Sequence, residues 1–408
     1  PMNPETHPRL PLPEPRRGLE PGSFAEHTMK NRLPRITRQV IADNDYPPEI
    51  VEALQALMAE LPGGPLLPLN DPGAPDLDLW EQDLRPHLGE TYLEAPWVLA
   101  ETYYFRRILQ ACAYFQPGPL QGKDPFLPQK EQGFQEGLEQ IRAYSAELNR
   151  WIQDRAPEGE VLEDLLHRAV WGNQADLSVF PAGGDSPSHT EDDDRRAHML
   201  VDDSSRVIDR LRDTARRVDF VMDNSALELF QDLALADFLL TRGLVAEVWL
   251  HCKRYPTYVS DVTPAGVLNL TARLQEDADA DVRFMGRRLR GYLVSGRLVL
   301  QDHPFWNTAR PTWEMPDDLR QTLAAASLVL SKGDLNYRRL FDDRHWEVTT
   351  PLQDVLGYLP APWAMLRVLK SETVLGLPPG AAEAAASRDP EWLTSGRWAV
   401  LQYQPLNH

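Results

Sequence analysis

The sequence has few of the features that mark a secreted or membrane protein. Its 408 residues include only two cysteines, Cys112 and Cys252, which allow one disulfide and no disulfide framework. No apolar run approaches the ~20 residues that a transmembrane helix needs, and no signal-peptide pattern is seen at the start. We therefore expect a protein of the reducing cytoplasm that has no membrane partner.

Basic residues are scarce relative to acidic ones. The chain has 42 lysines and arginines against 61 aspartates and glutamates, which gives a net charge of −19. This charge repels nucleic acids and anionic membranes, so we expect neither as a partner. It also repels phosphorylated metabolites, so a site for them needs a local basic pocket and the help of a metal cation. The sequence does not predict an oligomeric state.

Several common catalytic motifs are absent. The chain has no G-x-x-x-x-G-K-[ST] loop, no G-x-S-x-G turn, no H-E-x-x-H helix and no paired C-x-x-C. His251 precedes Cys252, a neighbour pair that suggests thiol chemistry. A small buried cysteine is the better interpretation, because no local feature of the sequence activates the thiol.

The chain divides into three parts by composition. Residues 1–22 are rich in proline and predict an extended tail. Residues 23–168 predict a helical N-terminal part, because their apolar residues recur at helical spacing between Pro/Gly/Asp clusters. Residues 169–408 predict an α/β catalytic domain that binds metal and phosphate. Within it, residues 182–198 are rich in Gly, Ser and Asp and predict a surface loop.

Short apolar runs alternate with amphipathic helices in the last 200 residues. This alternation predicts an α/β fold, a mostly parallel sheet with helices on both faces, preceded by the helical part. Ligands of such sheets bind beyond the carboxyl ends of the strands. The predicted strands are residues 218–222, 245–251, 257–260, 298–301, 328–331, 363–369 and 398–403.

Polar residues are concentrated where these predicted strands end. Asp223 and Asn224 follow residues 218–222, and Asp261 follows residues 257–260. Each could be structural, Asp223 as a helix N-cap and Asp261 as a turn residue. The remaining candidates follow the strands 328–331 and 363–369: Lys332, Asp334, Asn336, Tyr337, Arg338 and Lys370.

A divalent cation explains Asp223, Asn224 and Asp261 better than capping does. Two aspartates at neighbouring strand ends repel each other unless a cation lies between them. Carboxylate and amide oxygens are the hard ligands that Mg²⁺ and Mn²⁺ accept, and Co²⁺ or Ni²⁺ are further candidates. The sequence therefore predicts a metal site formed by these three residues.

These motifs, in this order, resemble the damage-control phosphatase family. The most similar subfamily is the third, which includes sugar-phosphate phosphatases and proteins described as acidic-residue (protein-glutamate) methyltransferases. The resemblance extends from about residue 23 to near the C-terminus. It rests on residues 171–178, 223–225 with Glu228, 259–262, 332–338 and 367–370, and in the helical part on 23–25, 32–34, 96–97 and Glu101.

The resemblance implies a role for each matching residue. Asp223, Asn224 and Asp261 match the catalytic metal ligands, and the first two also match substrate-contacting positions. Glu228 matches a position that contacts S-adenosylmethionine in the methyltransferases. The other matches to substrate-contacting positions are Asp334, Leu335, Asn336, Tyr337, Arg338 and Lys370.

Two residues depart from the family pattern. Val368 replaces the threonine of an R-T-x-K motif, so any contact made by that hydroxyl is lost. Ala226 replaces a glycine at the start of a helix, a change that we expect to leave the site intact.

We expect a metal-dependent phosphatase for small sugar phosphates such as fructose 1-phosphate or fructose 6-phosphate. Lys332, Arg338 and Lys370 would neutralise the phosphoryl charge, while Asp334 and Asn336 would bind sugar hydroxyls. The attacking group is either a water activated by the cation or the carboxylate of Asp223, and both stay open. The helical part is expected to form a wall or lid over the strand ends.

Two other functions remain as alternatives. A protein-carboxyl (glutamate) methyltransferase ranks second, because the glycine-rich turn usual after the first strand of doubly wound methyltransferases is missing. A catalytically silent metabolite-binding protein ranks third, because every candidate charged residue of the site is present.

Overall fold

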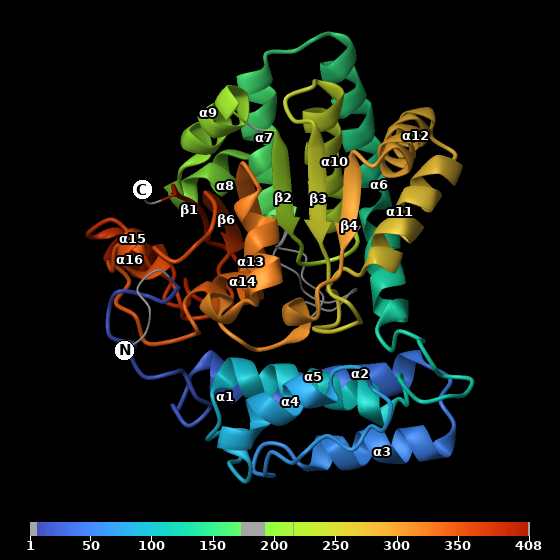
Figure 1. The fold of residues 1–408 in the computed structure, drawn as a ribbon, viewed down its shortest axis with the longest axis vertical. Coiled ribbons are helices and arrows are strands. Elements are labelled where there is room, and N and C mark those ends of the chain that lie inside the picture. The colour runs from blue at the N-terminus through green and yellow to red at the C-terminus, as the bar shows by residue number, and fades with distance from the viewer. Residues whose placement is uncertain (1–5, 173–191, 215, 407–408) are drawn as a thin grey trace.

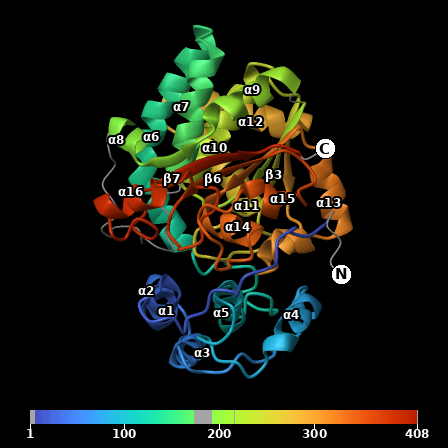
Figure 2. The same cartoon turned by 90° about the vertical axis from the view of Figure 1, so that its left-hand side faces the viewer.

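The computed structural model describes residues 6–172, 192–214 and 216–406. Figures 1 and 2 show a layer formed by the first five helices and, above it, a sheet with helices on both sides. The arrowheads of β2 and β3 point toward the helical layer (Figure 1). Residues 173–178, which belong to a motif of the family resemblance, and residues 182–191 of the predicted loop lie outside the described residues.

A seven-stranded sheet forms the centre of the molecule, with the strand order β1-β7-β6-β5-β2-β3-β4. All neighbouring strands are parallel except β6 and β7, which are antiparallel. The predicted mostly parallel α/β sheet is therefore confirmed. The strands are β1 (Met199–Asp202), β2 (Arg217–Val221), β3 (Glu247–His251), β4 (Leu298–Gln301), β5 (Leu328–Lys332), β6 (Trp363–Val368) and β7 (Ala399–Gln404).

Both faces of the sheet are buried, as the near-continuous apolar strands predict. Alternate residues of β2 enter different cores: Val218 and Phe220 pack on one face, and Val221 packs on the other. The first face is covered by α6 (Leu127–Gln153), α7 (Glu158–Trp171), α9 (Ser204–Thr214), α10 (Leu227–Thr241), α11 (Pro264–Glu276) and α12 (Ala280–Ser295). The second face is covered by α13 (Asp317–Ala324), α14 (Gly333–Leu340), α15 (Leu352–Leu356) and α16 (Ala381–Arg388).

The helical layer, which we call the cap, has an apolar core of its own. Tyr258, Val259 and Leu335 of the α/β part also enter this core, so the cap packs directly on the sheet edge. Its elements are α1 (Phe24–His27), a π-helix (Thr28–Arg32), α2 (Leu33–Asp43), α3 (Pro48–Ala59), α4 (Leu77–Leu84), a 3₁₀ turn (Arg85–His87) and α5 (Trp97–Ala111).

The later half of the predicted helical part lies against the sheet side of the molecule. Helices α6 and α7 pack on α10, and their apolar residues belong to the same core as β2. The predicted domain boundary at residue 168 stays a prediction. The remaining short elements are α8 (Asp192–Ala197) and two 3₁₀ turns, Pro304–Asn307 and Thr312–Glu314. Among the described residues, we find no helix with the length and apolarity needed to cross a membrane.

The helices begin and end at residues suited to those positions. Thr263 accepts a hydrogen bond from the backbone N–H of Gly266 and is followed by Pro264, so α11 starts there. Asp279 caps α12 in the same way, and α12 ends at Gly296 with φ of 73°.

The proline-rich tail is extended along the α/β part. The backbone N–H of Arg9 bonds the carbonyl of Asp354 at 3.2 Å, and that of Arg16 bonds the carbonyl of Asp343 at 3.0 Å. Leu10 packs against the core of the second sheet face. The tail therefore joins the end of the chain to the helices that cover this face.

One predicted strand is wrong. Residues 257–260 form a turn in which Tyr258 and Val259 have φ of 48° and 66°. Both edges of β3 are already paired, with β2 and β4, so a run after it has no free edge to join. Only Asp261 forms an isolated bridge, with Asn224. Strand β1, Met199–Asp202, was not among the predicted strands.

Candidate active site

The ends of β2 and β3 bring the three predicted metal ligands together. Asp223 and Asn224 follow β2, and their backbone pairs with the turn that carries Asp261. The N–H of Val262 bonds the carbonyl of Asp223 at 2.8 Å. All three side chains are nearly fully buried and line one cavity of about 30 Å³.

A glycine directly after the neighbouring strand β5 allows Asp223 to occupy this place. Gly333 begins α14 with φ of 81°, and a Cβ atom there would lie only 1.7 Å from Oδ2 of Asp223. Any other residue would therefore overlap the carboxylate and also have a strained backbone. The loop after β5 and the end of β2 thus fit together only with glycine at 333.

Hydrogen bonds fix the amide of Asn224. Its Oδ1 accepts from the Ser260 hydroxyl at 2.6 Å, while its Nδ2 donates to Asp223 and to Glu228, both at 2.9 Å. The amide oxygen is thereby oriented by the same turn that carries Asp261. The Glu228 carboxylate accepts a hydrogen bond from Asn224, a predicted metal ligand, but Glu228 does not line the cavity.

Lys332 lies in a buried ion cluster below the cavity. Its Nζ is 3.0 Å from Glu228 and 3.0 Å from Asp232, and its side chain is 0% exposed. Burial disfavours the ammonium form, but the two carboxylates outweigh it and raise the pKa of Lys332. Strand alternation turns Lys332 to the same face as Leu328 and Leu330, toward α10. The structure does not bring it to the cavity, where we expected it to bind phosphate.

Helix α14 divides the predicted substrate residues between two faces. Asp334, Leu335 and Arg338 line the cavity. Asn336 and Tyr337 point away from it: the Asn336 amide donates to the carbonyls of Met222 and Lys332, and the Tyr337 hydroxyl bonds Gln402. Residues one helical turn apart share a face, so a continuous run cannot line one cavity.

A buried network surrounds Asp334. Arg367 Nε donates to its Oδ1 at 2.9 Å, and the Ser371 hydroxyl donates to the same oxygen at 3.0 Å. Burial acts to raise the pKa of Asp334, but Arg367, Arg338 and Lys370 outweigh it and lower this pKa. Lys370, only 1% exposed, lines the cavity beside the predicted metal ligands.

The cap closes the cavity through a chain of buried charges. Glu101 of α5 binds Arg338 at 2.9 Å and also pairs with Arg32. The Arg338 guanidinium lies 3.7 Å from the ring centroid of Trp97, and Phe24 also lines the cavity. The prediction of site residues did not include these cap residues. The family resemblance included residues 23–25, 32–34, 96–97 and Glu101, but it gave them no role in the site.

The prediction of site residues also missed a buried lysine, Lys253, which lies two residues after the end of β3. Its Nζ is 3.4 Å from Oδ2 of Asp261 and donates to the Trp306 carbonyl at 2.7 Å. Burial lowers the pKa of Lys253, while Asp261 and Asp223 oppose this shift. No motif in the sequence distinguished this lysine.

The donor set fits a divalent cation such as Mg²⁺. Asp223, Asn224 and Asp261 offer three hard oxygen donors, and a cavity of about 30 Å³ suits one ion or one water. Across residues 6–172, 192–214 and 216–406, no group of three or more His, Cys, Asp or Glu side chains could hold a metal. Two carboxylates and an amide match an open Mg²⁺ site that leaves positions for water and substrate phosphate.

The two departures from the family pattern have different structural settings. Val368 is 0% exposed and packs in the core of the first sheet face, away from the cavity. Ala226 has φ of 59° and ψ of −130°, a backbone region that suits glycine. Alanine therefore introduces backbone strain next to Asn224.

A family model for the damage-control phosphatase ARMT1-like domain matches residues 28–385. The match includes every residue that lines the cavity except Phe24. The chain belongs to the damage-control phosphatase family. As a member of this family it is a phosphatase, and the family expected from the sequence motifs is confirmed.

Curated relatives of the damage-control phosphatase family match over nearly their whole length. The chain is 34% identical to damage-control phosphatase ARMT1 of Mus musculus, covering 94% of this chain and 96% of the mouse protein. It is 33% identical to the Homo sapiens protein of that name, with 95% and 97% covered. A solved DUF89 family protein of Pyrococcus horikoshii is 16% identical with a TM-score of 0.47, covering 92% of this chain and 97% of that one.

Removing the buried cation below the cavity should destabilise the fold. In Lys332→Met, Glu228 and Asp232 lose their shared positive partner, which typically costs about 3–5 kcal/mol. Denaturant unfolding monitored by circular dichroism measures this loss. The exposed ion pair of Lys30 with Glu26 provides the control, since Lys30→Met should cost less than about 1 kcal/mol. Wild-type stability combined with a raised KM would instead indicate that Lys332 contacts the substrate.

Proposed function

We propose that this phosphatase hydrolyses small sugar phosphates, such as fructose 1-phosphate or fructose 6-phosphate, with a divalent cation as cofactor. One observation carries the proposal: Asp223, Asn224 and Asp261 line the same cavity as Arg338 and Lys370. Oxygen donors for a cation thus lie beside two cations that can bind phosphate. A cytoplasmic location stays a prediction.

Two basic residues of the chain bind the phosphate group and compensate its negative charge. When bound, the cation supplies polarisation of the phosphoryl oxygens. Lys370 offers a compact ammonium to the phosphate dianion, and Arg338 offers a planar guanidinium that Glu101 and Trp97 keep in place. Lys370 and Arg338 both stabilise the negative charge on the phosphoryl oxygens as the bond to the leaving oxygen lengthens.

The substrate preference follows from the polar residues around the phosphate position. The partly buried carboxyl group of Asp334 lines the cavity and can accept hydrogen bonds from sugar hydroxyls. A cavity of about 30 Å³ cannot hold the sugar as well, so substrate entry requires that the cap move away from the strand ends. Exclusion of water after closure would strengthen the charge interactions inside.

The contacts of Glu228 bear on the methyltransferase alternative. This carboxylate bonds Asn224 and Lys332 and is 2% exposed, so it is placed to orient a metal ligand. A contact with S-adenosylmethionine would require it to leave both partners. The geometry therefore favours phosphoryl chemistry over methyl transfer.

Metal removal should abolish activity. Exhaustive chelation is expected to stop phosphate release from fructose 1-phosphate and fructose 6-phosphate, and Mn²⁺ or Mg²⁺ should restore it, because the divalent charge that polarises the phosphoryl oxygens is lost and regained. Asp261→Asn should need a higher Mn²⁺ concentration for half-maximal rate, whereas the exposed control Asp154→Asn should behave like wild type. Full activity after chelation would refute the metal assignment.

Loss of Lys370 should separate phosphatase from methyltransferase activity. In Lys370→Ala, phosphate release is expected to fall by ~10²–10³-fold, because a charge that stabilises the transition state is removed. Mn²⁺ affinity should persist, and the exposed control Lys123→Ala should be unaffected. Parallel assays measure phosphate release and methyl transfer from labelled S-adenosylmethionine. Wild-type methylation without phosphate release would contradict the proposed function.

A further inference from the structure

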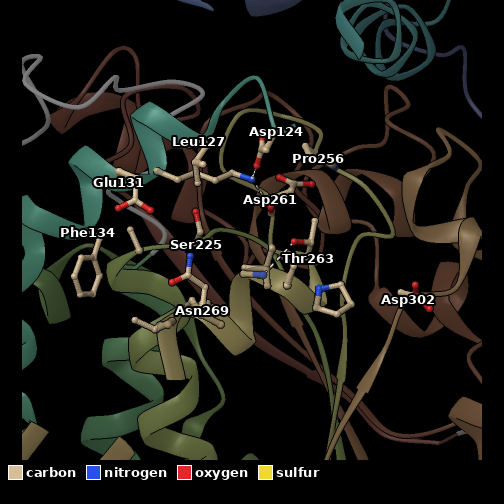
Figure 3. A pocket seen from close by; sticks show the side chains of 18 of the residues that line it. Asp124, Leu127, Glu131, Phe134, Ser225, Pro256, Asp261, Thr263, Asn269 and Asp302 are labelled. Atoms are coloured by element: carbon tan, nitrogen blue, oxygen red, sulfur yellow. Dashed lines mark hydrogen bonds and ion pairs between the residues drawn. The ribbon is translucent and has the colours of Figure 1, made fainter. Parts of the chain in front are cut away.

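A second and larger cavity lies beside the catalytic one. Its volume is about 410 Å³, and it is bordered by the first turns of α6, α10 and α11 and by the segment after β3 (Figure 3). Small-molecule sites have volumes of roughly 300–1,000 Å³, so this cavity has the size of such a site. Asp261 lines both cavities, but Asp223, Asp334 and Lys370 line only the smaller one.

The floor of the large cavity is apolar. Leu127 and Phe134 come from α6, Leu229 from α10, and Val262 and Leu270 from the region of α11. In Figure 3, Leu127 and Phe134 lie on the same side of the cavity as Glu131, and Asp302 lies on the opposite side. An apolar surface with a few polar groups at its border is typical of sites for amphipathic ligands.

Most of the charges around this cavity neutralise each other. Lys130 binds Asp124 at 2.8 Å, and Arg273 pairs with Glu131. Three charged residues remain: Asp261, whose carboxylate pairs with Lys253, and Arg254 and Asp302 at the border. Arg254 and Asp302 are both exposed, and within the described part of the chain neither side chain takes part in an ion pair.

Three donors favour an anion over a cation at this border. Arg254 carries a full positive charge, and the 13-residue helix α11 begins at this border. Of its first three residues only Ala265 offers an N–H to a ligand, because Pro264 has none and that of Gly266 bonds Thr263. Ser225 Oγ is buried and has no hydrogen-bond partner among the described residues. An anionic group would bind these donors and be opposed by Asp302, while the negative charge of Asp261 is offset by Lys253.

The large cavity is also linked to the metal ligands. Lys130 lines it and donates from Nζ to the backbone carbonyl of Asp261 at 3.2 Å. Ser225 directly follows Asn224 in the chain. A ligand in this cavity would therefore contact residues next to both Asn224 and Asp261 without occupying the catalytic cavity.

We propose that the large cavity is a second binding site, which takes a small amphipathic anion: an apolar body with one carboxylate, sulfonate or phosphate group. The apolar body lies on the floor formed by α6, α10 and α11. The anionic group binds Arg254, the Ser225 hydroxyl and the start of α11. This proposal does not rest on the proposed hydrolysis of sugar phosphates.

The probe for this site is 8-anilinonaphthalene-1-sulfonate, an apolar body with one sulfonate. Fluorescence titration of the full chain should show saturable binding of one probe. Arg254→Gln should weaken binding by about tenfold or more, since it removes a charge-assisted hydrogen bond. Asp302→Asn should tighten binding, because it removes the opposing charge. The control Arg290→Gln, an exposed arginine on α12 outside the cavity, should bind the probe like wild type.

Two further measurements locate the probe. Ala265→Phe fills the cavity from an exposed position and should abolish binding, whereas Leu268→Phe, exposed on the same helix but outside the lining, should not. Inorganic phosphate with Mn²⁺ should leave the titration unchanged. Displacement of the probe by phosphate would place it in the catalytic cavity and overturn the proposal, as would equal affinity in Arg254→Gln, Asp302→Asn and wild type.

Discussion

The carboxylate of Asp223 lies against the backbone of Gly333, where an added Cβ would be 1.7 Å from Oδ2. This approach joins the ends of β2 and β5, two neighbours in the middle of the sheet. The bridge between Asn224 and Asp261 then joins the end of β2 to the turn after β3. Three chain segments thus meet at one point beyond the strand ends, which is where α/β sheets bind their ligands. The other charged groups of the site are arranged around this junction.

A protein with a net charge of −19 binds anions only where cations are concentrated locally. The catalytic cavity achieves this with Arg338 and Lys370 in its lining and Lys253 beside Asp261. Each buried cation has carboxylates nearby, since an unpaired charge is costly in such an environment. Through Glu101, which binds Arg338, the cap contributes to this balance, so the charges of the site are paired only with the cap packed on the strand ends.

Much of the fold followed from the sequence because short apolar runs and helical spacing are local properties. Six of the predicted strands lie within two residues of observed ones, but the turn at 257–260 resembled a strand because Tyr258 and Val259 are apolar and buried. The strand-end rule correctly brought Asp223, Asn224 and Asp261 together. The strand-end rule failed for Asn336, because the residues after β5 form helix α14 and the helix turns Asn336 away from the cavity. The strand-end rule could not identify Arg32 and Glu101, because their contacts with the site depend on the packing of the cap.

The central claim is that one divalent cation binds between Asp223, Asn224 and Asp261. Crystals grown with Mn²⁺ and measured by anomalous diffraction test this directly. The account predicts one strong anomalous peak within bonding distance of oxygen atoms of all three side chains. A well-ordered Mn²⁺ bound only elsewhere, with the Asn224 amide still bonded to Asp223 and the Asp261 carboxylate still paired with Lys253, would contradict it.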